Sequence, residues 1–171
     1  PSPSATPSRP ATPTPSATPT ATPRPRTAVD ITREGTVSAS SVFGGNQFPA
    51  GLSVDGDVTT SWFSAGPGAD GTTTFRWQGN GEATLNTLTI VTNLQHSNPS
   101  FRRGFGFGQV VVRVFAANGS ASLERTVAYN PLQDLTVDLG GATGQRVDLV
   151  FSDHENVVCG GFSELRIVAL R

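Results

Sequence analysis

Leu52-Ser53-Val54-Asp55-Gly56-Asp57-Val58-Thr59-Thr60-Ser61-Trp62 is the stretch that tells most about the fold. It places two aspartates at i and i+2, with a glycine between them and a hydroxyl side chain at Thr60. This arrangement can wrap carboxylate, hydroxyl and carbonyl oxygens around one point, and Ca²⁺ takes about six to eight oxygen ligands. The same residues also fit an Asp-Gly turn that is capped by its own side chains and needs no metal. Spacing alone leaves both interpretations open.

On both sides of this stretch, the sequence is typical of an all-β domain. Short runs rich in Val, Thr, Phe and Ile are separated by Gly, Asn, Asp and Pro, and no helical spacing persists over three turns. One helical turn is expected near 49–54, and Asn118-Gly119 predicts a type I′ hairpin. The eight predicted strands, which fit a two-sheet sandwich or jelly roll, are 35–41, 72–78, 84–92, 109–116, 122–128, 135–139, 145–151 and 162–170.

Four short motifs occur in an order that resembles the discoidin, or coagulation factor 5/8 type C, superfamily. They are Val37-Ser38-Ala39-Ser40-Ser41, Asp55-Gly56-Asp57, Thr60-Ser61-Trp62 and Gly161-Phe162-Ser163-Glu164-Leu165. The resemblance covers nearly all of residues 35–170 and implies an eight-stranded jelly-roll β-sandwich of the galactose-binding-like type. The chain lacks the cysteine pair that closes many animal members. This favours the bacterial branch, whose members are similar to family 32 carbohydrate-binding modules.

The resemblance also implies a structural Ca²⁺ ion. An ion at this position would tie an early loop to the last strand and so hold the two ends of the sandwich together. Carried over to this sequence, its side-chain ligands would be Asp55, Asp57, Thr60 and Glu164, with carbonyls near Leu52 and Ser163.

Residues 1–27 differ sharply from the rest of the chain, since they consist of nine Pro, seven Thr, four Ser, four Ala and three Arg. A segment without large apolar side chains cannot offset its ordering entropy by burial, and its prolines favour polyproline II. We therefore expect a disordered, extended Pro/Thr/Ser-rich linker over 1–27 and one domain over 28–171. The linker would join the domain to an upstream protein or anchor.

The charge of the domain argues against two classes of partner. Residues 28–171 carry nine Arg and 13 acidic residues, a net charge of −4. Nonspecific nucleic-acid binding needs clustered positive charge, so we expect no nucleic-acid partner. Anionic membranes attract basic surfaces, so membrane binding is also disfavoured. No run of apolar residues is long enough to span a bilayer.

The segment 93–108, NLQHSNPSFRRGFGFG, lies between two predicted strands and is rich in functional groups. Sugar recognition needs an apolar face for the C–H side of a pyranose, and planar donors and acceptors for its hydroxyl pairs. In the alternative interpretation, the phenylalanines close the end of the sandwich and the arginines are solvated. The predicted ligand contacts, matched by residue type and loop position, are Phe105 and Phe107 for the face, and His96, Asn98, Arg102 and Arg103 for the hydroxyls.

A second polar segment, Asp153-His154-Glu155-Asn156, precedes the last strand. In a jelly roll this segment can approach the His96 loop, which makes His154 and Asn156 further ligand candidates; the alternative is a polar turn. Cys159 cannot form an internal disulfide and is expected to be a small buried residue. Two His, one Cys and no G-x-S-x-G motif leave little catalytic material, so we expect no enzyme activity in this domain.

These observations predict a carbohydrate-binding module that is extracellular or at the cell surface and tethers an attached protein to glycans. Galactose- or hexosamine-type glycans are the expected ligands, with weak affinity in the micromolar to millimolar range. Two alternatives stay open. One is a discoidin module that binds a protein or a membrane through exposed Phe105 and Phe107. The other is a structural accessory domain without a ligand.

Overall fold

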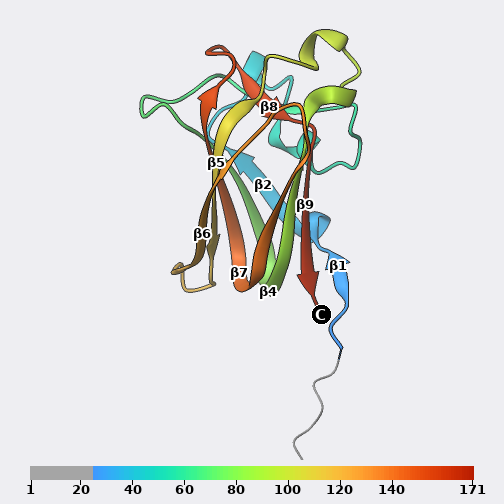
Figure 1. Ribbon diagram of the computed structural model, residues 1–171, viewed down its shortest axis with the longest axis vertical. Coiled ribbons are helices and arrows are strands. Elements are labelled where there is room, and N and C mark those ends of the chain that lie inside the picture. Colours follow the sequence, from blue (N-terminus) through green and yellow to red (C-terminus); the bar gives the residue numbers. More distant parts are fainter. Residues whose placement is uncertain (1–24) are drawn as a thin grey trace, which may run out of the picture.

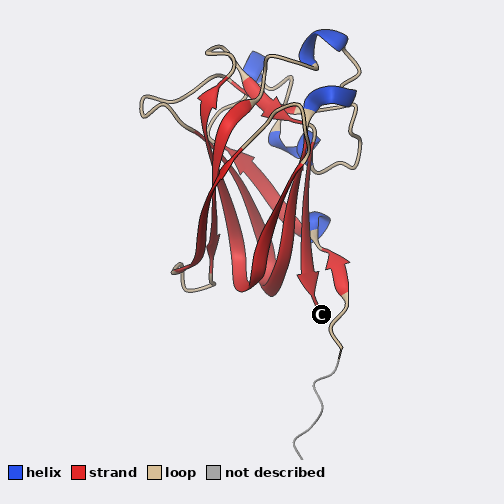
Figure 2. Cartoon of the chain, in the orientation of Figure 1, coloured by secondary structure: helices blue, strands red, loops and turns tan. Residues whose placement is uncertain are grey.

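The computed structural model describes residues 25–171, which form a β-sandwich with most of its short helices at one end (Figure 1 and Figure 2). The predicted linker, 1–27, lies outside the described residues except for its last three. The strands are β1 Ala28–Asp30, β2 Gly35–Ala39, β3 Trp62–Ser64, β4 Thr73–Val91, β5 Phe107–Phe115, β6 Ala121–Ala128, β7 Leu135–His154, β8 Gly160–Phe162 and β9 Glu164–Leu170. The 3-10 helices are η1 Thr32–Glu34, η2 Phe43–Gly45, η3 Ala50–Ser53, η4 Asn93–Gln95 and η5 Pro99–Phe101.

Two long strands, β4 and β7, each take part in both layers of the sandwich. The β4–β7 register shifts between Gln78 and Ala83, and Gly140 and Gly141 of β7 have positive φ, so both strands turn at the lower end in Figure 1. The first half of β4 pairs with β2 and with the second half of β7, which leads on to β5 and β6. The second half of β4 pairs with the first half of β7 and with β9, which leads on to β1. The resulting sandwich has the antiparallel jelly-roll architecture.

All eight predicted strands are confirmed. The runs 72–78 and 84–92 are the two halves of β4, and 135–139 and 145–151 lie in the two halves of β7. The helical turn near 49–54 is also confirmed, as η3. The prediction missed β1 and β3, and it did not separate β8 from β9; these missed elements are only three residues long.

A cluster of aromatic side chains fills the upper half of the core. The Trp62 indole lies 5.0 Å from the Phe75 ring and 5.4 Å from the Phe162 ring, measured between centroids. Phe107 stacks on Phe151 at 4.2 Å. All five side chains are fully buried. The T-S-W motif therefore marks the place where the chain leaves the 52–61 loop and enters the core.

The two ends of the described chain meet at the lower end of the sandwich (Figure 1). Thr27 and Arg171 exchange two backbone hydrogen bonds, of 2.6 and 2.9 Å, and the Arg171 guanidinium pairs with Glu34. The long connections between strands gather at the opposite end. Within 25–171, no helix has the length and apolar character needed to cross a membrane.

Candidate ligand site at the loop end

His96 holds the 93–106 connection in place rather than presenting a surface. Its side chain is only 5 % exposed, and its ring lies 5.2 Å from the Phe101 ring and 5.9 Å from the Phe63 ring. Its Nδ1 accepts a hydrogen bond from the Asn98 backbone N–H at 3.0 Å. Burial lowers the pKa of His96, which favours the neutral ring. The imidazole is enclosed by aromatic rings, so the predicted ligand contact of His96 would require the loop to move.

Phe107, one of the two phenylalanines assigned as ligand contacts, lies in the core of the sandwich. Its side chain is fully buried between Trp62 and Phe151, so it cannot provide a face for a sugar. Phe105 is half-buried and packs edge-on against Phe101 at 5.5 Å. The alternative interpretation, that the phenylalanines close the end of the sandwich, holds for Phe107 in full and for Phe105 in part.

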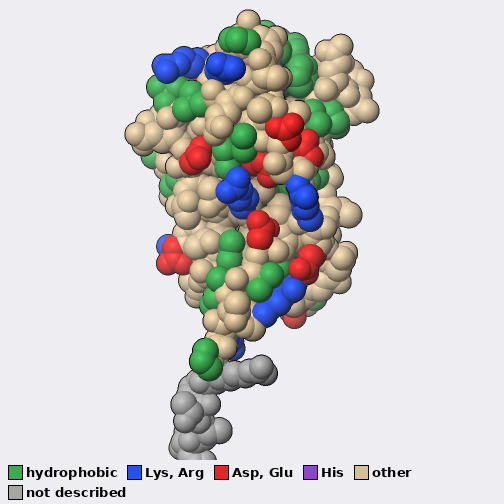
Figure 3. Space-filling model, turned by 90° about the vertical axis from the view of Figure 1, so that its right-hand side faces the viewer, with side chains coloured by type: hydrophobic (Ala, Val, Ile, Leu, Met, Phe, Trp, Pro, Cys, Tyr) green, Lys and Arg blue, Asp and Glu red, His purple; other side chains and the backbone are tan. Residues whose placement is uncertain are grey.

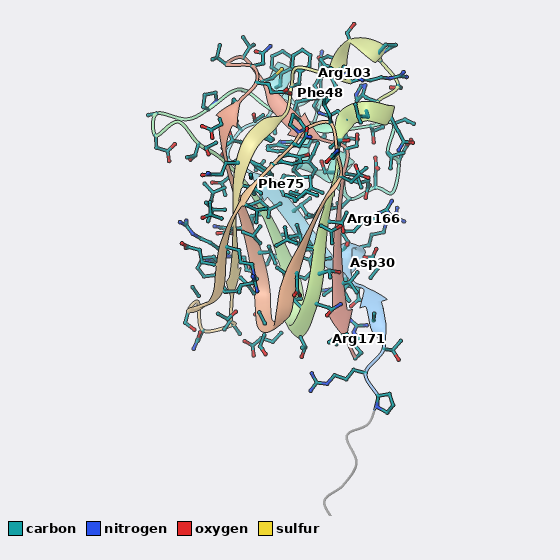
Figure 4. The ribbon with its side chains drawn as sticks, in the orientation of Figure 1. Asp30, Phe48, Phe75, Arg103, Arg166 and Arg171 are labelled. Carbon is teal, nitrogen blue, oxygen red and sulfur yellow. The ribbon has the colours of Figure 1, made fainter. Side chains whose placement is uncertain are left out.

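Of the other polar ligand candidates in this connection, Asn98 and Arg102 build the loop, whereas Arg103 makes no bond to the described residues. Asn98 Oδ1 accepts the Ser100 N–H at 3.0 Å and so begins η5. Arg102 Nε donates to the His96 carbonyl at 2.8 Å, while its terminal nitrogens make no further bond within 25–171. The exposed Arg103 side chain makes no hydrogen bond or ion pair to the described part of the chain, and it lies at the loop end in Figure 4.

The 153–156 segment does approach the His96 loop, but through Glu155. The Gly106 N–H donates to Glu155 Oε2 at 2.8 Å, and the Glu155 N–H donates to the Gly106 carbonyl at 3.0 Å. His154 instead bonds Thr73 Oγ1 at 2.9 Å, and Asn156 Oδ1 accepts the Val158 N–H at 2.8 Å. Burial lowers the pKa of His154. The two predicted candidates therefore serve the local structure, and the residue between them reaches the loop.

A crevice opens between the connections that follow β4, β6 and β7. Its floor holds two polar side chains that the sequence analysis did not single out, Asn93 and Tyr129, which are 5 % and 4 % exposed. In the present side-chain arrangement the crevice is too narrow for a water molecule. The residues that line it are Asn93, Phe101, Arg102, Arg103, Phe105, Gly106, Tyr129, Pro131, Glu155 and Gly161.

Both floor residues have unused hydrogen-bonding capacity. Asn93 Nδ2 donates to the Gly161 carbonyl at 2.9 Å, whereas its buried Oδ1 has no partner within 25–171. The Tyr129 hydroxyl likewise makes no hydrogen bond to the described residues, and burial raises its pKa, with smaller contributions from Asp134 and Glu155. A buried acceptor without a donor costs stability, so such an atom is commonly satisfied by water or by a ligand. A ligand in the crevice can donate a hydrogen bond to Asn93 Oδ1. It can also donate to the Tyr129 hydroxyl or accept from it.

Hydrogen bonds within the 52–60 loop bring several oxygen atoms together, and the Asp57 N–H donates to Asp55 Oδ1 at 2.8 Å, as in a self-capped Asp-Gly turn. Thr60 Oγ1 donates to Asp55 Oδ2 at 2.9 Å and lies 3.4 Å from the Leu52 carbonyl. The Gly56 N–H donates to Glu164 Oε1, which brings β9 to the loop. Asp57 Oδ1 accepts the Thr59 N–H and hydroxyl at 2.9 and 2.6 Å, and these bonds lower the pKa of Asp57.

Two further facts bear on whether this loop fits a cation. Within 25–171, no group of three or more His, Cys, Asp or Glu side chains is arranged to hold a metal, so carbonyl and hydroxyl oxygens would have to complete the shell. Glu164 is only 4 % exposed, and burial raises its pKa, with the nearby Asp55 carboxylate adding to the effect. The exposed Asp55 carboxylate repels the buried Glu164 carboxylate, and a hard cation relieves this repulsion. The donor set therefore fits Ca²⁺ through Asp55, Thr60 and Glu164.

Several solved structures share this fold. The family 32 carbohydrate-binding module of NanJ from C. perfringens, in complex with galactose, matches with a TM-score of 0.63 and 17% identity, over 83% of this chain and 99% of that one. An F5/8 type C domain from Bacteroides fragilis matches with a TM-score of 0.65 and 16% identity, over 86% and 98% of the two chains. A Streptococcus pneumoniae fucose-binding module matches with a TM-score of 0.64 and 12% identity, over 81% and 96%.

At the level of sequence, no family model and no curated protein matches this chain. The likeness in structure nevertheless spans more than four fifths of the chain and nearly the whole of each neighbour. It agrees with the resemblance carried by the four sequence motifs. The domain therefore has the fold of the F5/8 type C, or discoidin, domains and of the family 32 carbohydrate-binding modules.

Proposed function

We propose that this domain is a non-catalytic carbohydrate-binding module and that the loop-end crevice contacts the sugar. The observation that carries the proposal is Asn93, which lines the crevice and whose buried Oδ1 has no donor within 25–171. Modules of the same fold are named for their complexes or ligands, which include galactose, fucose and GalNAc-β-1,3-galactose. Galactose- or hexosamine-type glycans are therefore the first ligands to test.

The residues around the crevice supply what a pyranose requires. A sugar hydroxyl can donate to Asn93 Oδ1 and a second can pair with the Tyr129 hydroxyl, while the Arg103 guanidinium offers planar donors to vicinal oxygens. The edges of Phe101 and Phe105 border the same opening and can meet the C–H face. Entry of a sugar requires the 101–106 segment to move outward. Gly104, which has a φ of 78° and open space beside its Cα, is free to turn there.

Tyr129→Phe is expected to weaken galactose or N-acetylgalactosamine binding about fivefold, which corresponds to the loss of one neutral hydrogen bond worth about 1 kcal/mol. Arg103→Gln is expected to weaken it at least as much. Titration calorimetry with the two sugars measures both effects. Arg125→Gln, which removes one charge from an exposed position on β6, is the control and should bind as the parent does. Equal affinities in all four proteins would exclude this crevice as the sugar site.

We further propose that a structural Ca²⁺ ion binds the 52–60 loop. Asp55 and Glu164 would supply charge, Thr60 a hydroxyl, and the Leu52 carbonyl a further oxygen. When bound, the ion would neutralise the two facing carboxylates and fix the loop to β9. To act as a ligand, the Asp57 carboxylate would have to give up its hydrogen bonds to Thr59. The Ser163 hydroxyl is paired with the Ser61 hydroxyl at 3.0 Å, so only the Ser163 carbonyl is a candidate ligand.

The absence of enzyme activity and the surface location form part of the same proposal. Burial raises the pKa of Cys159, which opposes formation of a thiolate nucleophile, and both histidines are packed against aromatic rings. A proline-rich linker that joins the domain to an upstream protein would place this module on extracellular or cell-surface glycans. The module would then raise the local concentration of its attached partner there.

One observation favours adhesion to a membrane or protein as a second candidate function. Val157 and Val158 are 79 % and 57 % exposed at the loop end, and Leu132 is 43 % exposed on the connection after β6. The apolar contact would therefore come from these aliphatic residues and not from Phe105 and Phe107. Flotation with neutral and anionic liposomes tests this candidate. Binding that is lost in a Val157→Ser, Val158→Ser double variant would support it, and absence of flotation with both liposomes would reject membrane adhesion.

A further inference from the structure

A groove on the side of the sandwich is separate from the loop-end crevice. It has a volume of about 350 Å³ and runs between η1, the 54–56 turn and β9. None of its lining residues also lines the crevice. Figure 3 turns this face toward the viewer and shows basic and acidic side chains gathered near its middle, and Figure 4 shows Arg166 and Asp30 on the same side. The lining is Asp30, Thr32, Arg33, Glu34, Val54, Gly56, Glu164, Leu165 and Arg166.

The two arginines of this groove are free to bind an external group. Arg33 and Arg166 are both exposed, and neither forms an ion pair with an acidic side chain within 25–171. Arg33 donates one hydrogen bond, to the Asp55 carbonyl, and Arg166 donates none to the described residues. Guanidinium groups that face an open groove therefore retain most of their donors.

The carboxylates of the groove, in contrast, are already engaged. Glu34 pairs with Arg171, and Glu164 accepts the Gly56 N–H. Asp30 Oδ1 accepts the Thr32 N–H at 2.9 Å. Each of the three carboxylates therefore has one partner within the protein, while the two guanidinium groups keep unused donors. These donors favour a ligand that is rich in acceptors.

We propose that this groove is a second ligand site, which binds a saccharide bearing a carboxylate or a sulfate through Arg33 and Arg166. A guanidinium binds either group in a planar, two-point arrangement. The volume lies at the lower end of the range for small-molecule sites, and the half-buried Val54 supplies apolar contact for the sugar ring. Because residues 28–171 carry a net charge of −4, general attraction of polyanions does not account for such binding; the local arginines do.

The test uses the whole 171-residue chain and two pairs of defined polymers. Polygalacturonate is compared with its methyl ester, and dextran sulfate with dextran, by affinity electrophoresis and titration calorimetry. We expect a charged member of a pair to bind and its neutral partner not to bind. Retention of polygalacturonate alone identifies a uronate ligand, and retention of dextran sulfate alone identifies a sulfate ester. Absence of binding to both polyanions would overturn the proposal.

Arg166→Gln is the primary variant. The Arg166 side chain makes no hydrogen bond or ion pair to the described residues, so its loss should not weaken the fold. The substitution is expected to weaken binding of the polyanion about tenfold, as is typical when a hydrogen bond to a charged group is lost. Arg33→Gln is expected to act similarly, and its melting temperature reports any loosening of the 55–56 turn. Arg125→Gln carries the same change of charge on the β6 strand and should leave binding intact.

The outcome is independent of the loop-end proposal. Tyr129→Phe alters the crevice and leaves the side groove unchanged, so it should retain the polyanion while losing affinity for the neutral sugar. Arg166→Gln should show the reverse. If Arg166→Gln, Arg33→Gln and Arg125→Gln all bind the polyanion as the parent does, the groove is not the site. If Tyr129→Phe and Arg103→Gln abolish polyanion binding while Arg166→Gln does not, the acidic ligand belongs to the crevice.

Discussion

Removal of calcium is expected to lower the free energy of unfolding by about 4 kcal/mol when the reference Ca²⁺ concentration is about 1,000 times its Kd. The physical reason is the meeting of Asp55 with the buried Glu164, whose pKa is raised by burial and by the neighbouring carboxylate. Without a cation, this pair of charges opposes the contact between the loop and β9. Urea denaturation with EDTA and with added CaCl₂ measures the difference.

The chain offers a matched control for this experiment. Asp70 forms the same kind of turn as Asp57, since it accepts the Thr72 N–H and hydroxyl at 3.0 and 2.9 Å, but within the described residues no glutamate faces it. Asp55→Asn is expected to abolish the response to calcium, whereas Asp70→Asn should keep it. Asp57→Asn decides whether that carboxylate leaves Thr59 to bind the ion. A parent protein with the same stability in EDTA and CaCl₂ would rule out the metal.

The calcium response should also depend on pH in a defined direction. Glu164 must be ionised to bind the ion, and its pKa in the metal-free fold lies above the ordinary value. Protons therefore compete with Ca²⁺ at this residue. Stabilisation by calcium is expected to be complete at pH values well above the raised pKa and to decline as the pH falls through it. A response that stays constant across this window would show that Glu164 is not a ligand.

The strands are predictable from the sequence because their signal is local. Val110, Val112 and Val114 are buried and alternate with half-exposed neighbours, as the period of a β-strand requires. Phe107 breaks this alternation, since its parity with Val110 would place it outside, yet its ring is fully buried. On the partner strand, Asp153 adopts φ 53° beside Gly108, next to the point where the alternation breaks. Nothing in the sequence of residues 93–108 predicts this change in the backbone.

The hairpin at Asn118-Gly119 shows that the sequence predicts the position of a turn better than its type. The connection between β5 and β6 lies where the sequence predicts it, but the turn is not type I′, because only Gly119 has a positive φ, of 82°. The Gly119 N–H donates to the Ala116 carbonyl, and the Ala116 N–H donates to the Ser120 carbonyl, which makes a longer loop. A dipeptide signal identifies the hairpin, while the register of the flanking strands selects the turn.

The candidate site is predictable as a region and not as a set of residues. The sequence indicates the 93–108 and 153–156 connections, and the crevice does lie between them. Its floor, however, joins Asn93 to Tyr129, which are distant in sequence and meet only because β4 and β7 each enter both layers. A polar residue just beyond a buried strand end, as Asn93 lies two residues after β4, is the signal that could have identified it. Tyr129 directly follows β6, but β6 is mostly exposed, so the same signal does not identify Tyr129.

Trp62→Ala is expected to lower the free energy of unfolding by about 3–5 kcal/mol, the usual cost of removing a fully buried aromatic side chain. The indole packs against Phe75 and Phe162, and its Nε1 donates to the Ser41 carbonyl at 3.2 Å. A cavity in the middle of this cluster cannot be filled by small movements, because its neighbours are held on different strands. Urea denaturation followed by circular dichroism gives the value.

Trp62→Phe separates the packing of the ring from its hydrogen bond. It keeps an aromatic side chain but leaves the Ser41 carbonyl without its donor, so a smaller loss of about 2 kcal/mol is expected. The Trp62 backbone N–H donates to Ser53 Oγ in η3, at 3.2 Å, and neither substitution removes this bond, so both variants should keep their response to calcium. A loss below about 1 kcal/mol in Trp62→Ala would contradict the central place given to this residue.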